Sequence, residues 1–278
     1  MPIVLESYKS NLTMRVIIIP TDFSENAFNA LTCAIQYFNN EEATFFIVHT
    51  CETKENHQSK EFEEQLDHLL ERVEYLTFNP LHHFDTQVIY GNLMTQLDNL
   101  VDVQNADLVV MGTQGRTADR KMSFGSNTLK VIKKVKCPVL AIPLELEFKS
   151  PDRILFPSEL LIPFKNRELD LLSSIAYNHG SVLNLLHIAK FDTLSQRQQE
   201  MKALWESRFR ESEIKYKRQD LGVPTTVINN IITQNDIDLL VLVNSKHSFL
   251  ESFIQLPTID SLSLNLKIPF LILQNLPR

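Results

Sequence analysis

The chain carries the same alternation of short apolar runs and longer amphipathic stretches twice. The apolar runs of the first half are residues 16–19, 44–49, 87–90, 108–111 and 138–142. Runs separated by stretches with helical spacing are typical of βαβ units around a parallel sheet. Asp107 and Pro138 each have a counterpart 131 residues later, in Asp238 and Pro269. A period this long predicts two copies of one domain rather than a solenoid of short repeats.

Each copy is expected to form an open, five-stranded parallel sheet of the Rossmann-like α/β class. We assign residues 14–146 to the first domain, residues 152–278 to the second, and the residues between them to a short linker. Residues 1–13 form a predicted N-terminal arm. We expect no signal peptide there, because Glu6 and Lys9 leave no room for an apolar core segment.

Composition excludes several classes of protein. A formal net charge of -7 argues against nucleic acid as the main partner, since phosphate binding needs clustered Lys and Arg. No apolar run approaches the ~20 residues that a membrane-spanning helix requires. The three cysteines are odd in number and widely spaced, so they predict no disulfide framework. We therefore expect a cytoplasmic protein.

Glycine is scarce, with 6 in 278 residues where a usual frequency of roughly 7% would give about 19. Half of them, Gly112, Gly115 and Gly125, follow the fourth apolar run. Ligands of open parallel sheets bind at this end of the strands. Glycines there permit a positive φ and a close backbone approach, and the next helix, from about residue 127, would offer N–H groups to an anion. Ordinary turn chemistry explains the same glycines about equally well.

Basic residues gather beside these glycines. Between residues 116 and 136 there are seven of them and one acid, Asp119. Three of the seven, Lys130, Lys133 and Lys134, lie near the end of the expected helix, where cations are favoured in any case. We interpret those three as solvated surface.

Two motifs resemble those of a known family. The spacing G-x2-G-x9-G-S at residues 112–126, followed by C-P-V-L at residues 137–140, resembles the nucleotide-binding signature of the universal stress protein family. The P-T-D-F-S sequence at residues 20–24 resembles that family's opening motif. The likeness covers residues 14–144 and extends more weakly over residues 153–273. The chain thus resembles a tandem universal stress protein.

The resemblance implies a stress-response protein whose first domain binds ATP or AMP, with or without Mg²⁺. Asp22 would face the adenosine, and the backbone of Thr50 would meet the adenine edge. Met111 and Gly112 would line the ribose side, and the phosphates would lie near the start of the next helix. Without the resemblance, Asp22 is more simply a turn former. The implied cofactor-binding residues are Pro20, Thr21, Asp22, Thr50, Met111, Gly112, Gly115, Gly125, Ser126 and Asn127.

The second half has lost these features. Val243, Lys246, Leu256 and Pro257 stand where the first half has its three glycines and Ser126. A β-branched side chain disfavours positive φ, and Pro257 has no N–H to offer a phosphate. We predict that this half binds no nucleotide and pairs with the first half through the edge at residues 270–273, much as two single-domain subunits pair.

Nothing in the sequence predicts an enzyme. There is no P-loop, no metal-ligand cluster and no nucleophile–base pair at motif spacing. We expect at most weak ATP hydrolysis. A slow ATPase of the adenine-nucleotide α-hydrolase type and a ligand-free interaction module stay open as alternatives, as does a homodimer. His49 and His187 end buried strands and are interpreted as structural, whereas His82 and His83 are expected in a surface loop.

Overall fold

The computed structural model describes residues 14–52, 56–76, 79–114, 124–144, 146–161, 165–220, 222–245, 249–250 and 267–275. The predicted arm at residues 1–13 lies outside this part of the chain. The first half contains β1 (Arg15–Pro20), α1 (Glu25–Tyr37), β2 (Ala43–Cys51), α2 (Asn56–Leu76), β3 (His82–Tyr90), α3 (Leu93–Val103), β4 (Leu108–Gly112), α4 (Ser126–Lys134) and β5 (Val139–Ile142). The second half contains β6 (Arg153–Ser158), α5 (Asn166–Asn178), β7 (Val182–Ala189), α6 (Gln196–Arg208), β8 (Glu213–Asp220), α7 (Pro224–Gln234), β9 (Leu239–Asn244) and β10 (Phe270–Gln274).

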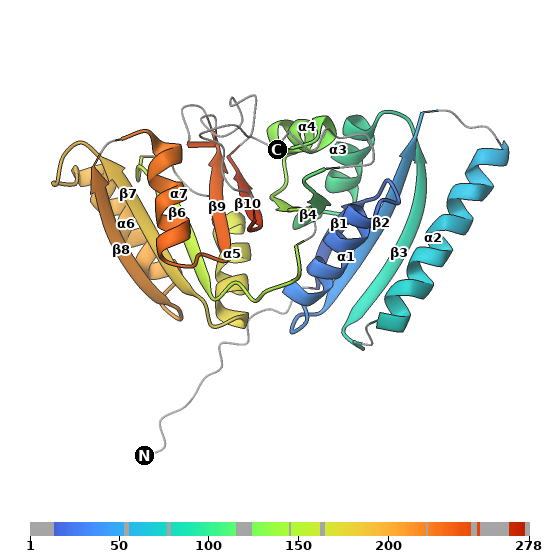
Figure 1. The fold of residues 1–278 in the computed structure, drawn as a ribbon, viewed down its shortest axis with the longest axis horizontal. Coiled ribbons are helices and arrows are strands. Elements are labelled where there is room, and N and C mark those ends of the chain that lie inside the picture. Colours follow the sequence, from blue (N-terminus) through green and yellow to red (C-terminus); the bar gives the residue numbers. More distant parts are fainter. Residues whose placement is uncertain are drawn as a thin grey trace, which may run out of the picture.

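The described strands form one ten-stranded sheet in the order β3-β2-β1-β4-β5-β10-β9-β6-β7-β8 (Figure 1). From its outer edge to the centre, each half contributes its third, second, first, fourth and fifth strand. Neighbouring strands within a half are parallel. The predicted α/β class with two five-stranded parallel sheets is confirmed, and the two sheets are continuous with each other.

The halves join at the centre of this sheet. β5 and β10 pair antiparallel, with Leu271 opposite Leu140 and Ile272 opposite Val139. The edge at residues 270–273 thus makes the contact between halves that the sequence predicts. Backbone hydrogen bonds across the junction satisfy both strand edges, which would otherwise present unpaired N–H and C=O groups.

Helices cover both faces of the sheet, as the apolar strands require. One apolar core contains side chains of α1, α2, α5 and α6, and the other contains side chains of α3, α4 and α7. Successive residues of β1 show the alternation, since Ile17 belongs to the first core and Ile18 to the second, both fully buried. Each core contains residues of both halves.

The repeat extends to backbone detail. Among the described residues, four that are not glycine have a φ in the left-handed region, and they form two equivalent pairs. Phe23 (φ 58°) corresponds to Leu160 (φ 57°), and Asn105 (φ 49°) corresponds to Asp236 (φ 48°). The period of 131 residues also holds in the strand register, where Gly112 is paired as its counterpart in β9 is. Both halves therefore use the same strained turns, which only a shared fold explains.

The expected start of the third strand is wrong. The third strand begins at His82 rather than at residue 87, and His82 is buried where we expected a surface loop. Its Nε2 lies 3.1 Å from the Phe38 carbonyl oxygen, and its ring packs edge-on against Phe45. Burial lowers the pKa of His82. His83 is exposed, as expected. The start of this outer strand was not recognisable in the sequence, because only alternate residues of such a strand face the core and the others are polar.

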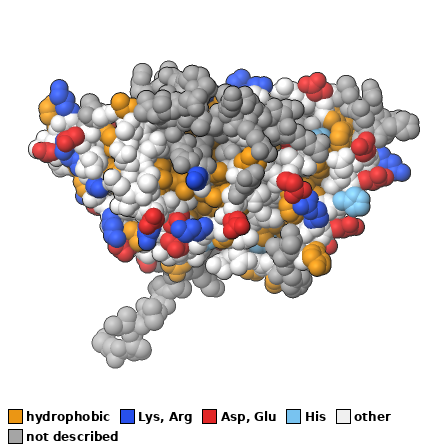
Figure 2. All heavy atoms as spheres, viewed as in Figure 1, with side chains coloured by type: hydrophobic (Ala, Val, Ile, Leu, Met, Phe, Trp, Pro, Cys, Tyr) orange, Lys and Arg blue, Asp and Glu red, His pale blue; other side chains and the backbone are white. Residues whose placement is uncertain are grey.

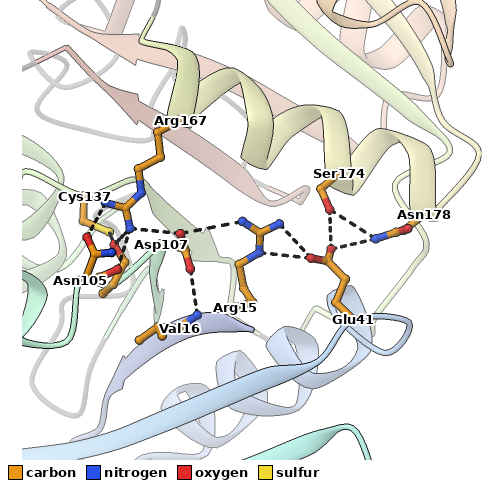
Figure 3. A network of polar contacts seen from close by, with 10 residues as sticks. Arg15, Val16, Glu41, Asn105, Asp107, Cys137, Arg167, Ser174 and Asn178 are labelled. Atoms are coloured by element: carbon orange, nitrogen blue, oxygen red, sulfur yellow. Dashed lines mark hydrogen bonds and ion pairs between the residues drawn. The ribbon is translucent and has the colours of Figure 1, made fainter. Parts of the chain in front are cut away.

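Polar contacts also join the halves at the amino ends of the strands (Figure 3). Arg167 of α5 donates to a carboxylate oxygen of Asp107 at 3.0 Å. Arg15 donates to Glu41 at 2.8 Å, and that glutamate accepts from the Ser174 hydroxyl of α5 at 2.7 Å. α5 is therefore fixed to the first half at two places by charge-assisted hydrogen bonds.

The surface agrees with the composition. On the face drawn in Figure 2, Lys and Arg side chains lie among Asp and Glu side chains and form no continuous basic stripe within the described residues. No helix in the described ranges has the length and apolar character needed to cross a membrane.

Candidate functional site

A cavity of about 450 Å³ opens at the carboxyl ends of β1, β2 and β4. Nine of the ten predicted binding residues line it, and the tenth, Gly115, lies outside the described residues. The cavity lies where parallel sheets bind their ligands. Its full lining is Pro20, Thr21, Asp22, Ala27, Val48, His49, Thr50, Leu93, Met111, Gly112, Gln114, Phe124, Gly125, Ser126, Asn127, Thr128 and Leu129.

The turn after β1 forms one wall. The Thr21 N–H donates to the Val48 carbonyl at 2.8 Å, which extends the β1–β2 ladder by one bond. Asp22 Oδ1 accepts from the Ser24 N–H at 3.1 Å, and Ser24 in turn caps α1. Asp22 is thus a turn former, as its sequence context favours, and it also lines the cavity. Its turn role leaves the carboxylate in a fixed position beside the cavity.

His49 belongs to the same wall. Its Nδ1 lies 2.8 Å from the Thr21 carbonyl oxygen, and its ring packs against those of Phe23 and Phe62, with centroids 4.6 and 4.4 Å away. This agrees with the structural role expected for it. The counterpart in the second half, His187, makes the same contact with a carbonyl oxygen, that of Ser158, at 3.1 Å.

Gly112 is required for a different reason from the one expected. It does not have a positive φ, so backbone freedom is not what selects glycine here. A Cβ at this position would lie 2.8 Å from the side-chain Cγ of Asn26 and 3.2 Å from the Asn26 carbonyl oxygen. The Asn26 side chain crosses this point to donate to the Gln114 carbonyl at 2.5 Å. Close packing between α1 and β4 therefore excludes any side chain.

The start of α4 forms the opposite wall. Gly125 is its N-cap, with φ −65° and ψ 156°, so the positive φ expected here is also wrong. No side chain caps this end, and neither Ser126 nor Asn127 is buried. The Gly125 N–H donates to the Thr113 carbonyl at 2.7 Å, and Thr128 Oγ1 donates to the Gly112 carbonyl at 2.9 Å. The first-turn N–H groups, together with the positive end of the helix dipole, can bind an anion.

Basic and metal-binding groups add little to the described lining. Lys130, Lys133 and Lys134 are exposed on α4, as interpreted from the sequence. The predicted basic residues 116–121 lie outside the described residues. In the described ranges no three His, Cys, Asp or Glu side chains gather closely enough to hold a metal ion.

Sequence reasoning missed several apolar residues of the lining. Leu93, Phe124 and Leu129 all face the cavity. Phe124 is 9% exposed and packs edge-on against Phe270 of β10, with ring centroids 5.8 Å apart. An aromatic residue directly before Gly125 was the available signal, since a solvated loop has no need of one. Its partner in the second half could be found only from the fold.

The corresponding strand ends of the second half carry apolar side chains. Val243 stands in β9 where β4 has Gly112, and Leu242 and Ile188 stand where the first half has Met111 and Thr50. Leu242 and Ile188 are buried. The predicted substitutions at residues 246, 256 and 257 lie outside the described part of the chain.

Comparison with known proteins agrees with this geometry. Residues 13–143 match the universal stress protein family. This match confirms, for the first half, the resemblance drawn from the glycine motif. A universal stress protein of Thermus aquaticus, from the QAH/OAS sulfhydrylase 3' region, is 28% identical over 134 residues, which are 46% of this chain and 98% of that protein.

Two further proteins resemble a shorter and a longer part of this chain. The Na(+)/H(+) antiporter NhaS5 of Synechocystis sp. is 33% identical over 100 residues, 36% of this chain, and the matched stretch spans 14% of the antiporter. The crystal structure of a universal stress protein from Archaeoglobus fulgidus DSM 4304 aligns with a TM-score of 0.67 at 17% identity, covering 93% of this chain and 98% of that one. At that identity the likeness shows the fold, and it extends over both halves.

Proposed function

We propose that this chain is a tandem universal stress protein whose first half binds one adenine nucleotide, ATP or AMP, and whose second half binds none. The observation that carries the proposal is that nine of the ten residues implied by the family resemblance line one cavity. The second half then has a structural role, in which it takes the place of a partner subunit.

The chemistry of the walls supports a nucleotide. The start of α4 offers N–H groups and the Ser126 hydroxyl to phosphate oxygens, and no side chain competes for those groups as a cap. On the opposite wall, Asp22 and the backbone at Thr50 offer hydrogen-bonding groups to adenosine, beside the apolar Val48 and Leu93. A volume of about 450 Å³ lies within the usual range for small-ligand sites. If Mg²⁺ accompanies ATP, phosphate oxygens and water supply most of its ligands.

We propose binding rather than catalysis. Fast phosphoryl transfer needs a positioned base and an in-line water. Asp22 and His49 are the titratable side chains of the described lining, and each already hydrogen-bonds to the turn after β1. We expect turnover below about one per minute, where typical enzymes reach ~10 per second.

We place the protein in the cytoplasm. Cys33 and Cys137 are buried and form no disulfide, which suits a reducing compartment. Burial raises the pKa of the Cys33 thiol to about 11, so this thiol stays protonated and unreactive at neutral pH. Pairing of two chains into a homodimer stays a prediction.

Titration calorimetry of the full chain with ATP and with AMP tests the proposal. We expect one equivalent of nucleotide per chain, and mass spectrometry of freshly purified protein should detect the bound nucleotide. The start of α4 is the wall of the cavity that we propose binds phosphate, and we call it the phosphate wall. Gly125→Val should abolish binding, because a β-branched side chain at this wall would occupy the space of the phosphate. Gly222→Val, at an exposed glycine of the second half, is the matched control and should bind like the wild type. No binding, or two equivalents, would overturn the one-site proposal.

A further inference from the structure

The two ends of α4 face different halves of the molecule. The helix has nine residues, which corresponds to about 13 Å. Its first turn lines the cavity of the first half. The carbonyl groups of its last turn point to the second half, where they meet the side chains of β9 and β10. A helix this short is marginal by itself, so what holds its ends decides how firmly it is placed.

Two side-chain amides of the second half bind the last turn of α4. Asn244 Nδ2 donates to the Ile132 carbonyl at 3.0 Å, and Gln274 Nε2 donates to the same oxygen at 2.9 Å. Asn244 Nδ2 also lies 3.4 Å from the Lys133 carbonyl oxygen. Within a longer helix, these carbonyl groups would accept from N–H groups four residues later. Those residues lie beyond the end of α4, so the helix itself supplies no donor. We call Asn244 and Gln274 the amide pair.

The amide pair is itself rigidly held. Asn244 and Gln274 are opposite each other in the β9–β10 register, and Asn244 Nδ2 lies 2.8 Å from Gln274 Oε1. The Gln274 N–H donates to Glu168 Oε2 of α5 at 3.0 Å, and both residues are buried, at 1% and 5% exposure. Because the amide pair lies on two adjacent strands and is bound to a buried carboxylate, its side chains have fixed positions and can hold α4 in place.

The second half also supports the cavity directly. Phe270 of β10, which is 1% exposed, packs against Phe124, which lines the cavity one residue before the N-cap of α4. The second half therefore contacts both the last turn of α4, through the amide pair, and Phe124, the residue before the N-cap of α4, through the Phe270 ring.

We propose that the second half positions the phosphate wall of the nucleotide site, with Asn244 and Gln274 as positioning residues that fix α4. This inference rests on the proposed function of the first half. By satisfying the last carbonyl groups, the amide pair prevents fraying of α4 and keeps its first-turn N–H groups preorganised for phosphate. Adenosine, which binds at the β1 and β2 wall, does not depend on the amide pair.

Local contacts limit the size of the effect. Thr128 Oγ1 and the Gly125 N–H bind the start of α4 to the carbonyl groups of Gly112 and Thr113, at 2.9 and 2.7 Å. These bonds persist when the amide pair is changed. The loss of phosphate affinity should therefore be partial.

Calorimetry of Asn244→Asp with ATP and with adenosine tests the inference. The isosteric carboxylate would place an oxygen against the Ile132 carbonyl and a negative charge at the negative end of the helix dipole. We expect ATP affinity to fall about tenfold and adenosine affinity to change less than about twofold. Asn230→Asp, the same change at an exposed site of α7, is the matched control and should leave both affinities unchanged.

A milder variant and a second measurement complete the test. Asn244→Ala keeps the fold intact if the aspartate does not, and should lower ATP affinity about threefold. In the nucleotide-free chain, hydrogen exchange of the α4 amides should be faster in either variant than in the wild type.

The outcomes separate the two proposals. If the wild-type chain binds no ATP, the proposed function fails and the positioning role fails with it. If the wild type binds ATP and Asn244→Asp binds it equally well, the positioning role alone is wrong. Equal losses of ATP and adenosine affinity in a folded variant would also overturn it, because they would show a general stabilising role.

Discussion

The two halves have the same strand order and different residues at the carboxyl ends of their strands. In the first half, Gly112 leaves room for the Asn26 side chain, and a cavity opens beside it. In the second half, Val243, Leu242 and Ile188 stand at the corresponding end. On the proposed function, the scaffold shared by the two halves does not decide whether nucleotide binds. A few side chains at the strand ends would decide it, which is how one fold can host different functions.

Exchanging Gly112 and its counterpart Val243 should have the largest effect on nucleotide binding and on stability. Gly112→Val copies the second half into the first, and its Cβ would meet both the side chain and the backbone of Asn26. We expect nucleotide binding to be lost, and the free energy of unfolding to fall by about 2–4 kcal/mol because the site is overpacked. Calorimetry and urea unfolding would measure both.

The reverse exchange is the matched control for that substitution. Val243→Gly should lower the free energy of unfolding by about 1–3 kcal/mol without creating a second site, because the neighbouring side chains stay apolar. Two equivalents of bound ATP in this variant would show that a single residue separates the halves.

The next largest difference should lie in how much the ion pairs of Asp107 and Asp238 contribute to stability. Asp107 and Asp238 each accept a backbone N–H at the amino end of their sheet. Arg167, which binds Asp107, also donates to the carbonyl groups of residues 105 and 106, whereas Lys149, which binds Asp238, has a side chain 65% exposed. We expect Arg167→Ala to cost about 1–2 kcal/mol of unfolding free energy and Lys149→Ala less than about 1. Equal costs in urea unfolding would contradict this ranking.

Helix capping gives a smaller difference. Ser24 caps α1 by accepting from the Ala27 N–H at 3.1 Å, whereas Lys165 occupies the N-cap of α5 and makes no side-chain capping bond. Ser24→Ala should therefore destabilise the chain by about 1 kcal/mol, and Lys165→Ser should stabilise it by about 0.5–1 kcal/mol. Thermal unfolding of both variants against the wild type would measure this, and a loss of stability in Lys165→Ser would contradict it.

The outer strands β3 and β8 should show the smallest difference in their contribution to stability, and only at acidic pH. β3 begins with the buried His82, whereas β8 begins with the exposed Glu213. Burial lowers the pKa of His82 in the folded chain, so the unfolded chain binds its proton more readily. This contribution to stability is complete above about pH 6.5, the ordinary pKa of histidine, and is lost as the pH falls below it. His82→Gln should flatten the acid side of the urea-midpoint profile, whereas His83→Gln should not.

Much of the fold could be predicted from the sequence because the central strands are buried on both faces. β1, β2, β4 and β5 are continuous apolar runs, and such runs are visible without a structure. β3 was found only in its second part, because an outer strand alternates polar and apolar residues. The edge contact of β10 with β5 was predictable, because an apolar strand at a sheet edge requires a partner.

The site was predictable where the backbone sets the chemistry. The motifs led to Asp22, Gly125 and Ser126, which all line the cavity. The reason for Gly112 was not predictable, because the obstacle is Asn26, 86 positions earlier in the chain. The packing of Phe270 on Phe124 and the contacts of the amide pair with α4 were not predictable for the same reason. These contacts depend on which strands become neighbours, and sequence spacing does not contain that.

The antiparallel pairing of β5 with β10 has a consequence for how the molecule responds to dilution. Two separate subunits joined at such an edge would dissociate at low concentration, and each would expose its apolar central strand. A covalent connection keeps the effective concentration of one edge near the other in the millimolar range. The assembled sheet is then insensitive to how much protein the cell holds, and a change in expression level alters the number of assembled sheets without altering their integrity.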